Sequence, residues 1–172
     1  MTSGDIGRTL RRMSHELLEL NQGSGGLLLL GILTRGAPLA HRIGVLLAEA
    51  EGHDVPVGEL DITMYRDDLR RHPAREVGHT QLPVRIDGQR VVLVDDVLYS
   101  GRTIQAALLA LADLGRPAAV ELMTLVDRGH REVPIQPHIV GRTLSTTPDQ
   151  RVRVHVAEID GADEVIVEGA TT

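Results

Sequence analysis

The first stretch of the chain repeats apolar positions with the period of a helix. From residue 5 to residue 20, apolar side chains recur at spacings of three and four, at Ile6, Leu10, Met13, Leu17 and Leu20. The remaining positions carry mainly polar and charged side chains, among them Arg8, Arg11, Arg12, His15 and Glu19. This pattern predicts an amphipathic helix with one buried face and one charged face.

Four short segments rich in apolar residues predict strands, at residues 27–30, 58–64, 91–94 and 119–126. Two further helices are expected between them. The first begins near Pro38 and runs to about residue 50, because proline suits the first turn of a helix. The second runs from about residue 102 to residue 114 and stops near Gly115. Strands that alternate with helices predict an α/β fold, with a parallel sheet, right-handed crossovers and helices on both faces.

The C-terminal part of the chain alternates with the period of a strand. Val152, Val154 and Val156 are separated by Arg153 and His155, which predicts a strand with one face in solvent. Residues 165–167 are expected to pair with it. No internal repeat or shift in composition marks a second unit, and 172 residues suit one domain spanning residues 1–172.

Composition excludes several kinds of chemistry. All 18 basic residues are arginine, and the chain has no cysteine. Schiff-base lysines, thiol nucleophiles and cysteine metal sites are therefore ruled out, whereas arginine is well suited to binding phosphate. A net charge of -6 argues against a uniformly basic surface for nucleic acid but permits a local basic patch. The most apolar run, residues 27–30, is too short to span a bilayer, so we expect a cytoplasmic protein with no membrane partner.

Residues 92–103 (VLVDDVLYSGRT) lead from an apolar strand through two carboxylates into a loop and a helix start. Asp95 and Asp96 are expected at the carboxyl end of the strand, where open α/β sheets bind ligands, and carboxylates can accept hydrogen bonds from sugar hydroxyls. The residues that follow offer hydroxyl groups, a glycine and a helix N-terminus that favours an anion. They are Val97, Leu98, Tyr99, Ser100, Gly101, Arg102 and Thr103. This order predicts that ribose binds at one end of the segment and phosphate at the other.

This segment resembles the 5-phosphoribosyl-1-pyrophosphate (PRPP) motif of type I phosphoribosyltransferases. The resemblance implies a type I phosphoribosyltransferase fold: a central, mostly parallel sheet flanked by helices, with a flexible loop over the active site. Two other interpretations are a buried strand ending in a solvated turn and the magnesium-binding strand of a P-loop ATPase. The ATPase requires a Gly-x-x-x-x-Gly-Lys loop, and the chain contains no lysine.

The same resemblance assigns roles to two arginine-containing segments. Thr34, Arg35 and Gly36 would present backbone N–H groups and a guanidinium to the leaving diphosphate. Residues 65–80 would form a loop that closes over PRPP and excludes water. Its candidate diphosphate contacts are Arg66, Arg70, Arg71 and Arg75. Without the resemblance, the first segment is an ordinary turn and the second a solvated, charged loop.

Two further tracts, residues 58–69 and 127–135, narrow the resemblance to the family of bifunctional pyrimidine operon regulators and uracil phosphoribosyltransferases. The resemblance places Asp127, Arg128 and Val152 beside the nucleobase. It implies the reaction of uracil with PRPP to give UMP and diphosphate, with Asp95, Asp96 and Arg35 as catalytic residues. Mg²⁺ would be bound largely through PRPP, because this ion seldom needs an all-protein cage.

The second activity implied by the resemblance is regulation through leader mRNA of a pyrimidine operon, dependent on UMP or UTP. The expected RNA contacts fall on Arg11, His15, Arg131, Gln136 and Arg142. Three of them depart from the usual family pattern: Arg11 replaces a threonine, Gln136 an arginine and Arg142 a lysine. Loss of a cation at Gln136 would remove a contact, whereas Arg11 would add one. Without the resemblance, the arginines of residues 5–20 are equally well a solvated helix face.

Two alternatives to a bifunctional enzyme and regulator stay open. One is an RNA-binding regulator that senses UMP or UTP with little or no turnover. The other is a purine phosphoribosyltransferase without an RNA role, which the tract at residues 127–135 disfavours. For the bifunctional protein and for the regulator with little turnover alike, the resemblance implies a homodimer or a larger homo-oligomer.

Overall fold

A computed structural model of the chain describes residues 1–67 and 79–169. Its centre is a five-stranded sheet with the order β2-β1-β3-β4-β5, in which every neighbouring pair is parallel. The strands are β1 (Leu27–Ile32), β2 (Val57–Leu60), β3 (Arg90–Leu98), β4 (Ala119–Asp127) and β5 (Ile139–Thr143). The prediction of a mostly parallel central sheet is confirmed.

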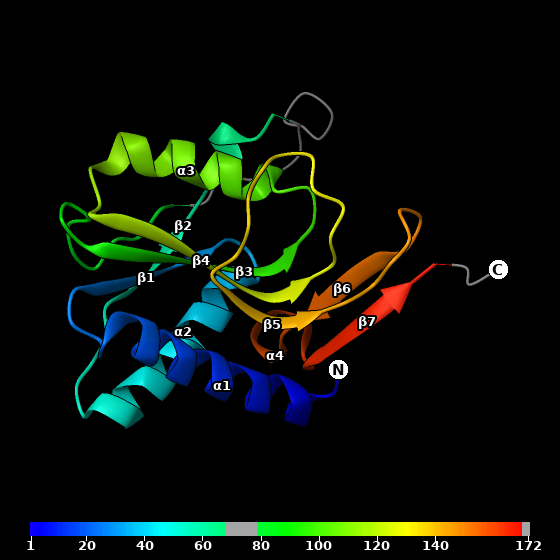
Figure 1. The fold of residues 1–172 in the computed structure, drawn as a ribbon, viewed down its shortest axis with the longest axis horizontal. Coiled ribbons are helices and arrows are strands. Elements are labelled where there is room, and N and C mark those ends of the chain that lie inside the picture. The colour runs from blue at the N-terminus through cyan, green and yellow to red at the C-terminus, as the bar shows by residue number, and fades with distance from the viewer. Residues whose placement is uncertain (68–78, 170–172) are drawn as a thin grey trace.

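Helices cover both faces of this sheet (Figure 1). α1 (Ser3–Asn21) and α2 (Gly36–Glu51) lie together on one face, and α3 (Arg102–Leu114) lies on the other. β1 and β3 alternate between the two layers: Leu29 and Val92 belong to the core cluster that contains α1 and α2, whereas Leu28 and Leu93 belong to the cluster that contains α3. This alternation explains why the strands are continuously apolar in sequence.

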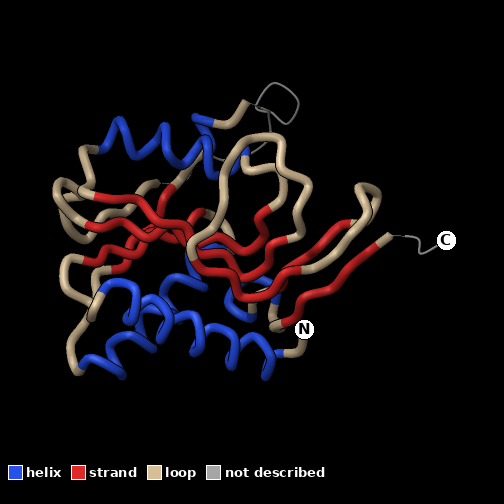
Figure 2. The backbone as a smooth tube through the Cα atoms, in the orientation of Figure 1, coloured by secondary structure: helices blue, strands red, loops and turns tan. Residues whose placement is uncertain are grey.

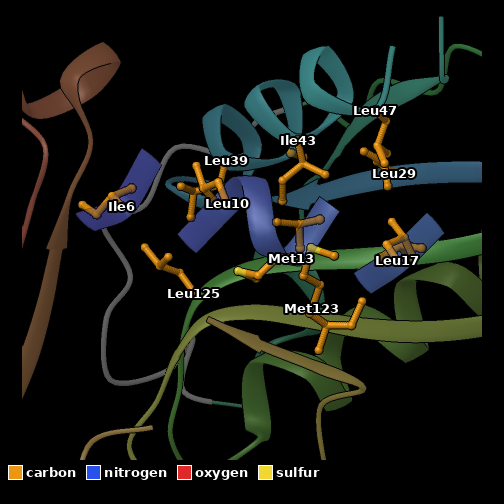
Figure 3. Close-up of a cluster of buried hydrophobic side chains, with 14 of the residues drawn as sticks. Ile6, Leu10, Met13, Leu17, Leu29, Leu39, Ile43, Leu47, Met123 and Leu125 are labelled. Carbon is orange, nitrogen blue, oxygen red and sulfur yellow. The ribbon is translucent and has the colours of Figure 1, made fainter. Parts of the chain in front are cut away.

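The predicted amphipathic helix is confirmed, and its apolar face is part of the core. Figure 3 shows apolar side chains of α1 between those of α2 and those of the sheet. Leu10, Met13 and Leu17 are each at most 2% exposed. Thr2 caps α1 in a capping box with Asp5, whose carboxylate accepts hydrogen bonds from the Thr2 N–H at 2.9 Å and from its hydroxyl at 2.7 Å.

A second, two-stranded sheet lies at one end of the first (Figure 2). It consists of β6 (Arg151–His155) and β7 (Glu164–Glu168), which pair as predicted and run antiparallel. A short helix, α4 (Ala157–Asp160), connects them. Val154, Val156 and Val165 are buried in the same core cluster as α1 and α2, so the small sheet is attached to the main body by apolar packing.

Two strand boundaries differ from the predictions. The strand expected at residues 58–64 ends at Leu60, because Asp61 Oδ1 accepts hydrogen bonds from the N–H and the hydroxyl of Thr63, at 2.8 and 2.6 Å. These bonds favour a turn, and a 3-10 helix, η1 (Thr63–Tyr65), follows. The strand expected at residues 91–94 continues to Leu98, which pairs with Asp127 of β4.

Besides η1, the elements β5 and α4 were not predicted. β5 contains only two large apolar residues before Gly141, and α4 is a single turn, so neither has a clear periodic pattern. The loop expected at residues 65–80 falls largely outside the described residues, and so do its arginines Arg70, Arg71 and Arg75. Within the described residues, no helix is long and apolar enough to cross a membrane.

Candidate functional site

The carboxyl ends of β1, β3 and β4 bring the predicted site residues to one edge of the sheet. Residues 34–36 follow β1, Asp95 and Asp96 lie in the last part of β3, and Asp127 ends β4. The pairing of Leu98 with Asp127 is part of the parallel register between β3 and β4. Asp95 and Asp96 are thus held inside a strand that continues to Leu98 rather than in the loop after it.

Asp95 and Asp96 form a tightly placed carboxylate pair. Asp95 is only 6% exposed, and its Oδ1 accepts the N–H of Asp96 at 3.0 Å. Asp96 Oδ1 accepts the N–H of Val97 at 2.9 Å. Burial raises the pKa of Asp95 well above its usual range, and the charge of Asp96 raises it further. Burial also raises the pKa of Asp96, although the Val97 N–H opposes the shift. A cation or several hydroxyl donors would favour the ionised pair.

Two glycines allow the segment after β1 to approach β3 closely. A Cβ atom added at Gly36 would lie 2.3 Å from the carbonyl oxygen of Val94, and one added at Gly31 would lie 2.4 Å from Cα of Ala37. These separations are far below van der Waals contact. Glycine is therefore required at residue 36 for α2 to begin directly beside Asp95. The peptide bond between Leu33 and Thr34 is cis.

Arg35 makes an ion pair that the sequence did not indicate. Its Nε and Nη2 donate hydrogen bonds to the two carboxylate oxygens of Asp160 in α4, at 3.0 and 2.7 Å. The Arg35 guanidinium and the N–H of Val156 lower the pKa of Asp160 to about 2. The ion pair joins the segment after β1 to the small sheet. No pattern around Asp160 signals this partner in the sequence.

A cavity of about 230 Å³ opens between the main sheet and the small one. It is lined by Arg35, Asp96, Val152, Arg153, Val154 and His155. The structure thus brings together three predicted site residues, Arg35, Asp96 and Val152. Arg153 and His155 were predicted only as strand positions. Asp127 and Arg128 do not line this cavity.

The predicted phosphate-binding segment forms the start of α3. Gly101 has φ +88° and takes the N-cap position, where it has no side chain to cap the helix. The hydroxyl of Ser100 accepts the N–H of Arg102 at 3.4 Å. The helix N-terminus is thus suited to accept an anion. The Arg102 side chain is directed elsewhere: it pairs with Asp67 at 2.5 Å and with Glu132 at 2.7 Å.

Asp127 and Arg128 do not form an ion pair with each other. Asp127 Oδ1 accepts the N–H of Gly129 at 2.9 Å, and its Oδ2 accepts Nη2 of Arg131 at 2.6 Å. Burial opposes ionisation of Asp127, but Arg131 and the Gly129 N–H outweigh it and lower the pKa of this carboxyl. Asp127 is therefore paired with Arg131 and not with the adjacent Arg128.

Arg128 is buried and stacks on an aromatic ring. Its guanidinium carbon lies 4.4 Å from the centre of the Tyr99 ring, and the residue is 7% exposed. Nη2 donates to the carbonyl oxygen of Thr147 at 3.1 Å, whereas its Nε has no hydrogen-bond partner within the described chain. Arg128 thus links the base-side segment to Tyr99 of the phosphate-binding segment.

The five residues expected to contact RNA lie on several elements. Arg11 and His15 are exposed on α1, beside α2, and Gln136 and Arg142 are exposed near and in β5. α1 packs against β5, and Arg12 Nη2 donates to the carbonyl oxygen of Gly141 at 2.7 Å. Arg131 is different, because its guanidinium is hydrogen-bonded within the protein.

The site shows no ready-made cage for a metal ion. Among residues 1–67 and 79–169, no group of three or more His, Asp or Glu side chains could hold one. Asp95 and Asp96 offer two adjacent carboxylates, so oxygens of a bound ligand would have to complete the coordination of a hard ion.

Comparisons with known proteins assign this chain to a family. Residues 4–158 match the model of the phosphoribosyl transferase domain. A bifunctional protein PyrR from Chloroflexus aurantiacus is 52% identical, over 97% of this chain and 92% of its own. The corresponding proteins of Thermus aquaticus and Streptomyces coelicolor are 53% and 54% identical, over 96% and 95% of this chain and 92% and 85% of theirs.

Solved structures agree on the fold. The hypoxanthine phosphoribosyltransferase of Trypanosoma cruzi aligns with a TM-score of 0.72 at 17% identity, over 97% of this chain and 93% of its own. A hypoxanthine-guanine phosphoribosyltransferase from Bacillus anthracis aligns with a TM-score of 0.67 at 18% identity, over 88% and 84%. At such identities the likeness concerns the fold alone, and it confirms the predicted type I phosphoribosyltransferase fold. The chain belongs to the phosphoribosyl transferase domain family and, within it, to the bifunctional PyrR proteins.

Proposed function

We propose that this protein transfers the phosphoribosyl group of PRPP to uracil, forming UMP and diphosphate, and that it regulates a pyrimidine operon through leader mRNA in response to UMP or UTP. The observation that carries the proposal is the Asp95–Asp96 pair, which precedes the N-terminus of α3 in the same segment of chain and lines, through Asp96, the same cavity as Arg35 and Val152. Carboxylates, a helix N-terminus and an arginine are the groups that ribose, phosphate and diphosphate require.

The carboxylate pair would bind the ribose of PRPP. Asp95 and Asp96 each use one oxygen to accept a backbone N–H. The two carboxyls also hydrogen-bond with each other, and ribose hydroxyls would take the place of that contact. Positive charge develops on the ribose as diphosphate leaves, and the ionised carboxylates would stabilise it. Because the pair belongs to a central strand, its position is set before the substrate binds.

Mg²⁺ fits this arrangement as an ion shared between protein and substrate. Asp95 and Asp96 are the residues that would contact it directly or through water, and diphosphate and ribose oxygens would supply the remaining ligands. The bound ion would neutralise the charge of the diphosphate. It would also favour ionisation of two carboxyls whose pKa values are raised in its absence.

The cavity beside Val152 would receive the pyrimidine. Its volume of about 230 Å³ suits a single-ring base, and Val152 and Val154 give it an apolar side. Backbone groups of the small sheet would pair with the donors and acceptors of uracil. We further propose that Asp127 and Arg128 act at this site, Asp127 by holding residues 128–131 and Arg128 by supporting Tyr99.

The start of α3 would bind the 5′-phosphate, through backbone N–H groups and the hydroxyls of Ser100 and Thr103. Arg35, with Thr34 and Gly36, would contact the diphosphate. Arg35 now donates both of its side-chain hydrogen bonds to Asp160. We infer that diphosphate competes with Asp160 for this guanidinium.

The regulatory activity would use exposed side chains of α1 and β5. Arg11 and His15 lie on α1, and Arg142 lies on β5. An overall charge of -6 requires that RNA bind at such a local patch. Bound UMP or UTP would bias the conformation that presents this patch, which couples the two sites. We expect a homodimer or larger homo-oligomer that acts in the cytoplasm, where leader mRNA is made.

The test is UMP formation from uracil and PRPP with Mg²⁺, by the wild-type protein and by the variant Asp96→Asn. We expect turnover in the wild type and its loss in the variant, with the thermal unfolding of both proteins cooperative. Wild-type turnover with guanine or hypoxanthine in place of uracil would contradict the assignment of the base. Equal retention of a leader RNA and a scrambled RNA would contradict the regulatory role.

A second candidate is a regulator that binds UMP or UTP with little turnover. The ion pair between Arg35 and Asp160 favours it, because the pair neutralises the cation expected to assist diphosphate departure. UMP binding measured by calorimetry without detectable UMP synthesis would support this candidate over the enzyme.

A further inference from the structure

The segment after β4 is hydrogen-bonded to the backbone of the phosphate-binding segment at two points. The N–H of Arg128 donates to the carbonyl oxygen of Leu98 at 3.1 Å. The N–H groups of Glu132 and Val133 both donate to the carbonyl oxygen of Ser100, at 2.9 and 3.1 Å. The orientation of the peptide groups that lead into α3 thus depends on a segment that starts at the base side of the site.

Arg131 occupies the centre of this segment. Its Nη1 donates to the carbonyl oxygen of Tyr99 at 2.9 Å, and its Nη2 donates to Oδ2 of Asp127 at 2.6 Å. Nε donates to the carbonyl oxygen of Ile135 at 2.9 Å, and Nη1 lies 3.3 Å from that of Gly129. One guanidinium therefore joins the phosphate-binding segment, the carboxylate that ends β4 and both ends of its own loop.

The ion pair between Arg131 and Asp127 is strengthened by its partial burial. The Arg131 and Asp127 side chains are 21% and 16% exposed, so solvent screens their ion pair less than it screens a surface pair. A planar guanidinium fixes the directions of its N–H groups, whereas the single ammonium group of lysine could not reach all of these acceptors at once. Loss of the side chain would leave a partly buried carboxylate and several carbonyl groups without their donor.

We propose that Arg131 is a positioning residue that holds the phosphate-binding segment in register with Asp127, so that PRPP binding and pyrimidine binding depend on the same side chain. This proposal rests on the proposed phosphoribosyltransferase function. It differs from the RNA contact expected at this position, because the guanidinium acts here within the protein. Arg131 reaches the ligands only through the Tyr99 carbonyl and through Asp127.

The experiment compares Arg131→Ala and Arg131→Lys with Asp127→Asn and with the control Arg85→Ala. Arg85 is a surface arginine whose side chain is 91% exposed, and its ion pair is with Asp87. Calorimetry measures the affinities for PRPP with Mg²⁺ and for UMP, and steady-state kinetics measures KM for PRPP and for uracil. Leader RNA retention is measured on the same proteins.

We expect Arg131→Ala to weaken binding of PRPP and of UMP, and to raise both KM values, by about tenfold each, as loss of a charged hydrogen-bonding partner implies. Arg131→Lys should recover less than half of the affinity that Arg131→Ala loses, measured as the logarithm of the affinity. Asp127→Asn should affect uracil more than PRPP, and Arg85→Ala should change neither. Unchanged affinities in Arg131→Ala, with loss of RNA retention alone, would overturn the proposal and leave Arg131 as an RNA contact.

Two results are kept separate by this design. If the wild-type protein made no UMP, the proposed reaction would fail, but the PRPP and UMP affinities would still decide the role of Arg131. If Arg131→Ala did not fold, the comparison of Arg131→Lys with the wild type would decide it. A Lys variant with wild-type affinity for both ligands would overturn the proposal.

Discussion

Arg35 and Asp160 lie 125 positions apart in the sequence and are joined by two hydrogen bonds, at 3.0 and 2.7 Å. One residue follows β1 of the large sheet, and the other ends the short helix of the small sheet. Arg35 lines the cavity that is also lined by Asp96 and Val152. The ion pair thus connects the two sheets at the point where the diphosphate of PRPP is expected to leave.

The ion pair makes stability depend on acidity. Because the pKa of Asp160 is lowered to about 2 in the folded protein, its contribution is present above the unfolded value near 3.9 and is lost as the pH falls through about 2. We expect the Tm of the wild type to fall more between pH 4.5 and pH 2 than that of Asp160→Asn. Calorimetric scans across this range measure the difference, and parallel curves would contradict the prediction.

Release of Arg35 should favour PRPP. In Asp160→Asn the guanidinium no longer faces a carboxylate, so diphosphate need not displace one. We expect KM for PRPP to fall by roughly threefold to tenfold, which corresponds to a partly exposed charge interaction. Asp163→Asn is the matched control, because Asp163 pairs with Arg42 rather than with Arg35. A higher KM in Asp160→Asn would mean that Asp160 holds Arg35 in the productive position.

Gly36 should tolerate no side chain. The Cβ of Gly36→Ala would lie 2.3 Å from the carbonyl oxygen of Val94, so either α2 or β3 must move. We expect a loss of about 1–3 kcal/mol in the free energy of unfolding, together with weaker PRPP binding. In Gly7→Ala the new methyl meets nothing within 4 Å in a helix interior, and it should stabilise by roughly 0.5–1 kcal/mol. Urea denaturation of both variants checks the contrast.

The buried carboxylate of Asp95 is expected to lower the stability of the folded protein at high pH, although UMP formation requires it. Its pKa is raised by burial and by Asp96, so the folded state binds a proton more tightly than the unfolded state does. Stability from this group is present below the unfolded value and is lost as the pH rises through the folded value. Asp95→Asn should therefore have a higher Tm at pH 8 and little gain at pH 4, while UMP formation is lost. An equal Tm at pH 8 would contradict this account.

The RNA-binding prediction for β5 can be tested through its salt dependence. Arg142 is exposed, and a phosphate contact there would release about one counterion. Arg142→Ala should weaken leader RNA binding and reduce the slope of log affinity against log salt by about one. Filter binding at several salt concentrations gives this slope, with Arg85→Ala as the control. An unchanged slope would place the RNA elsewhere.

The sequence by itself determined the features that depend on neighbouring residues. The periodicity of residues 5–20 predicts α1, which the structure confirms as Ser3–Asn21. The run at residues 91–94 predicts a buried strand, which the structure confirms as part of β3. The order of Asp95, Asp96 and Gly101 along one segment predicts a ribose and phosphate site. Such predictions are possible because the side chains share a strand or a helix, and regular geometry then sets their relative positions.

Tertiary structure decided which distant groups meet. Leu98 lies in β3 only because β4 supplies its hydrogen-bonding partners, and β5 follows from its place beside β4 and α1 rather than from its own pattern. The partner of Arg35 is Asp160, and that of Asp127 is Arg131 rather than the adjacent Arg128. Many carboxylates could pair with each arginine, and their pairing is settled by the packing of the small sheet and of residues 128–135 against the sheet edge. Local propensity carries no information about such long-range contacts.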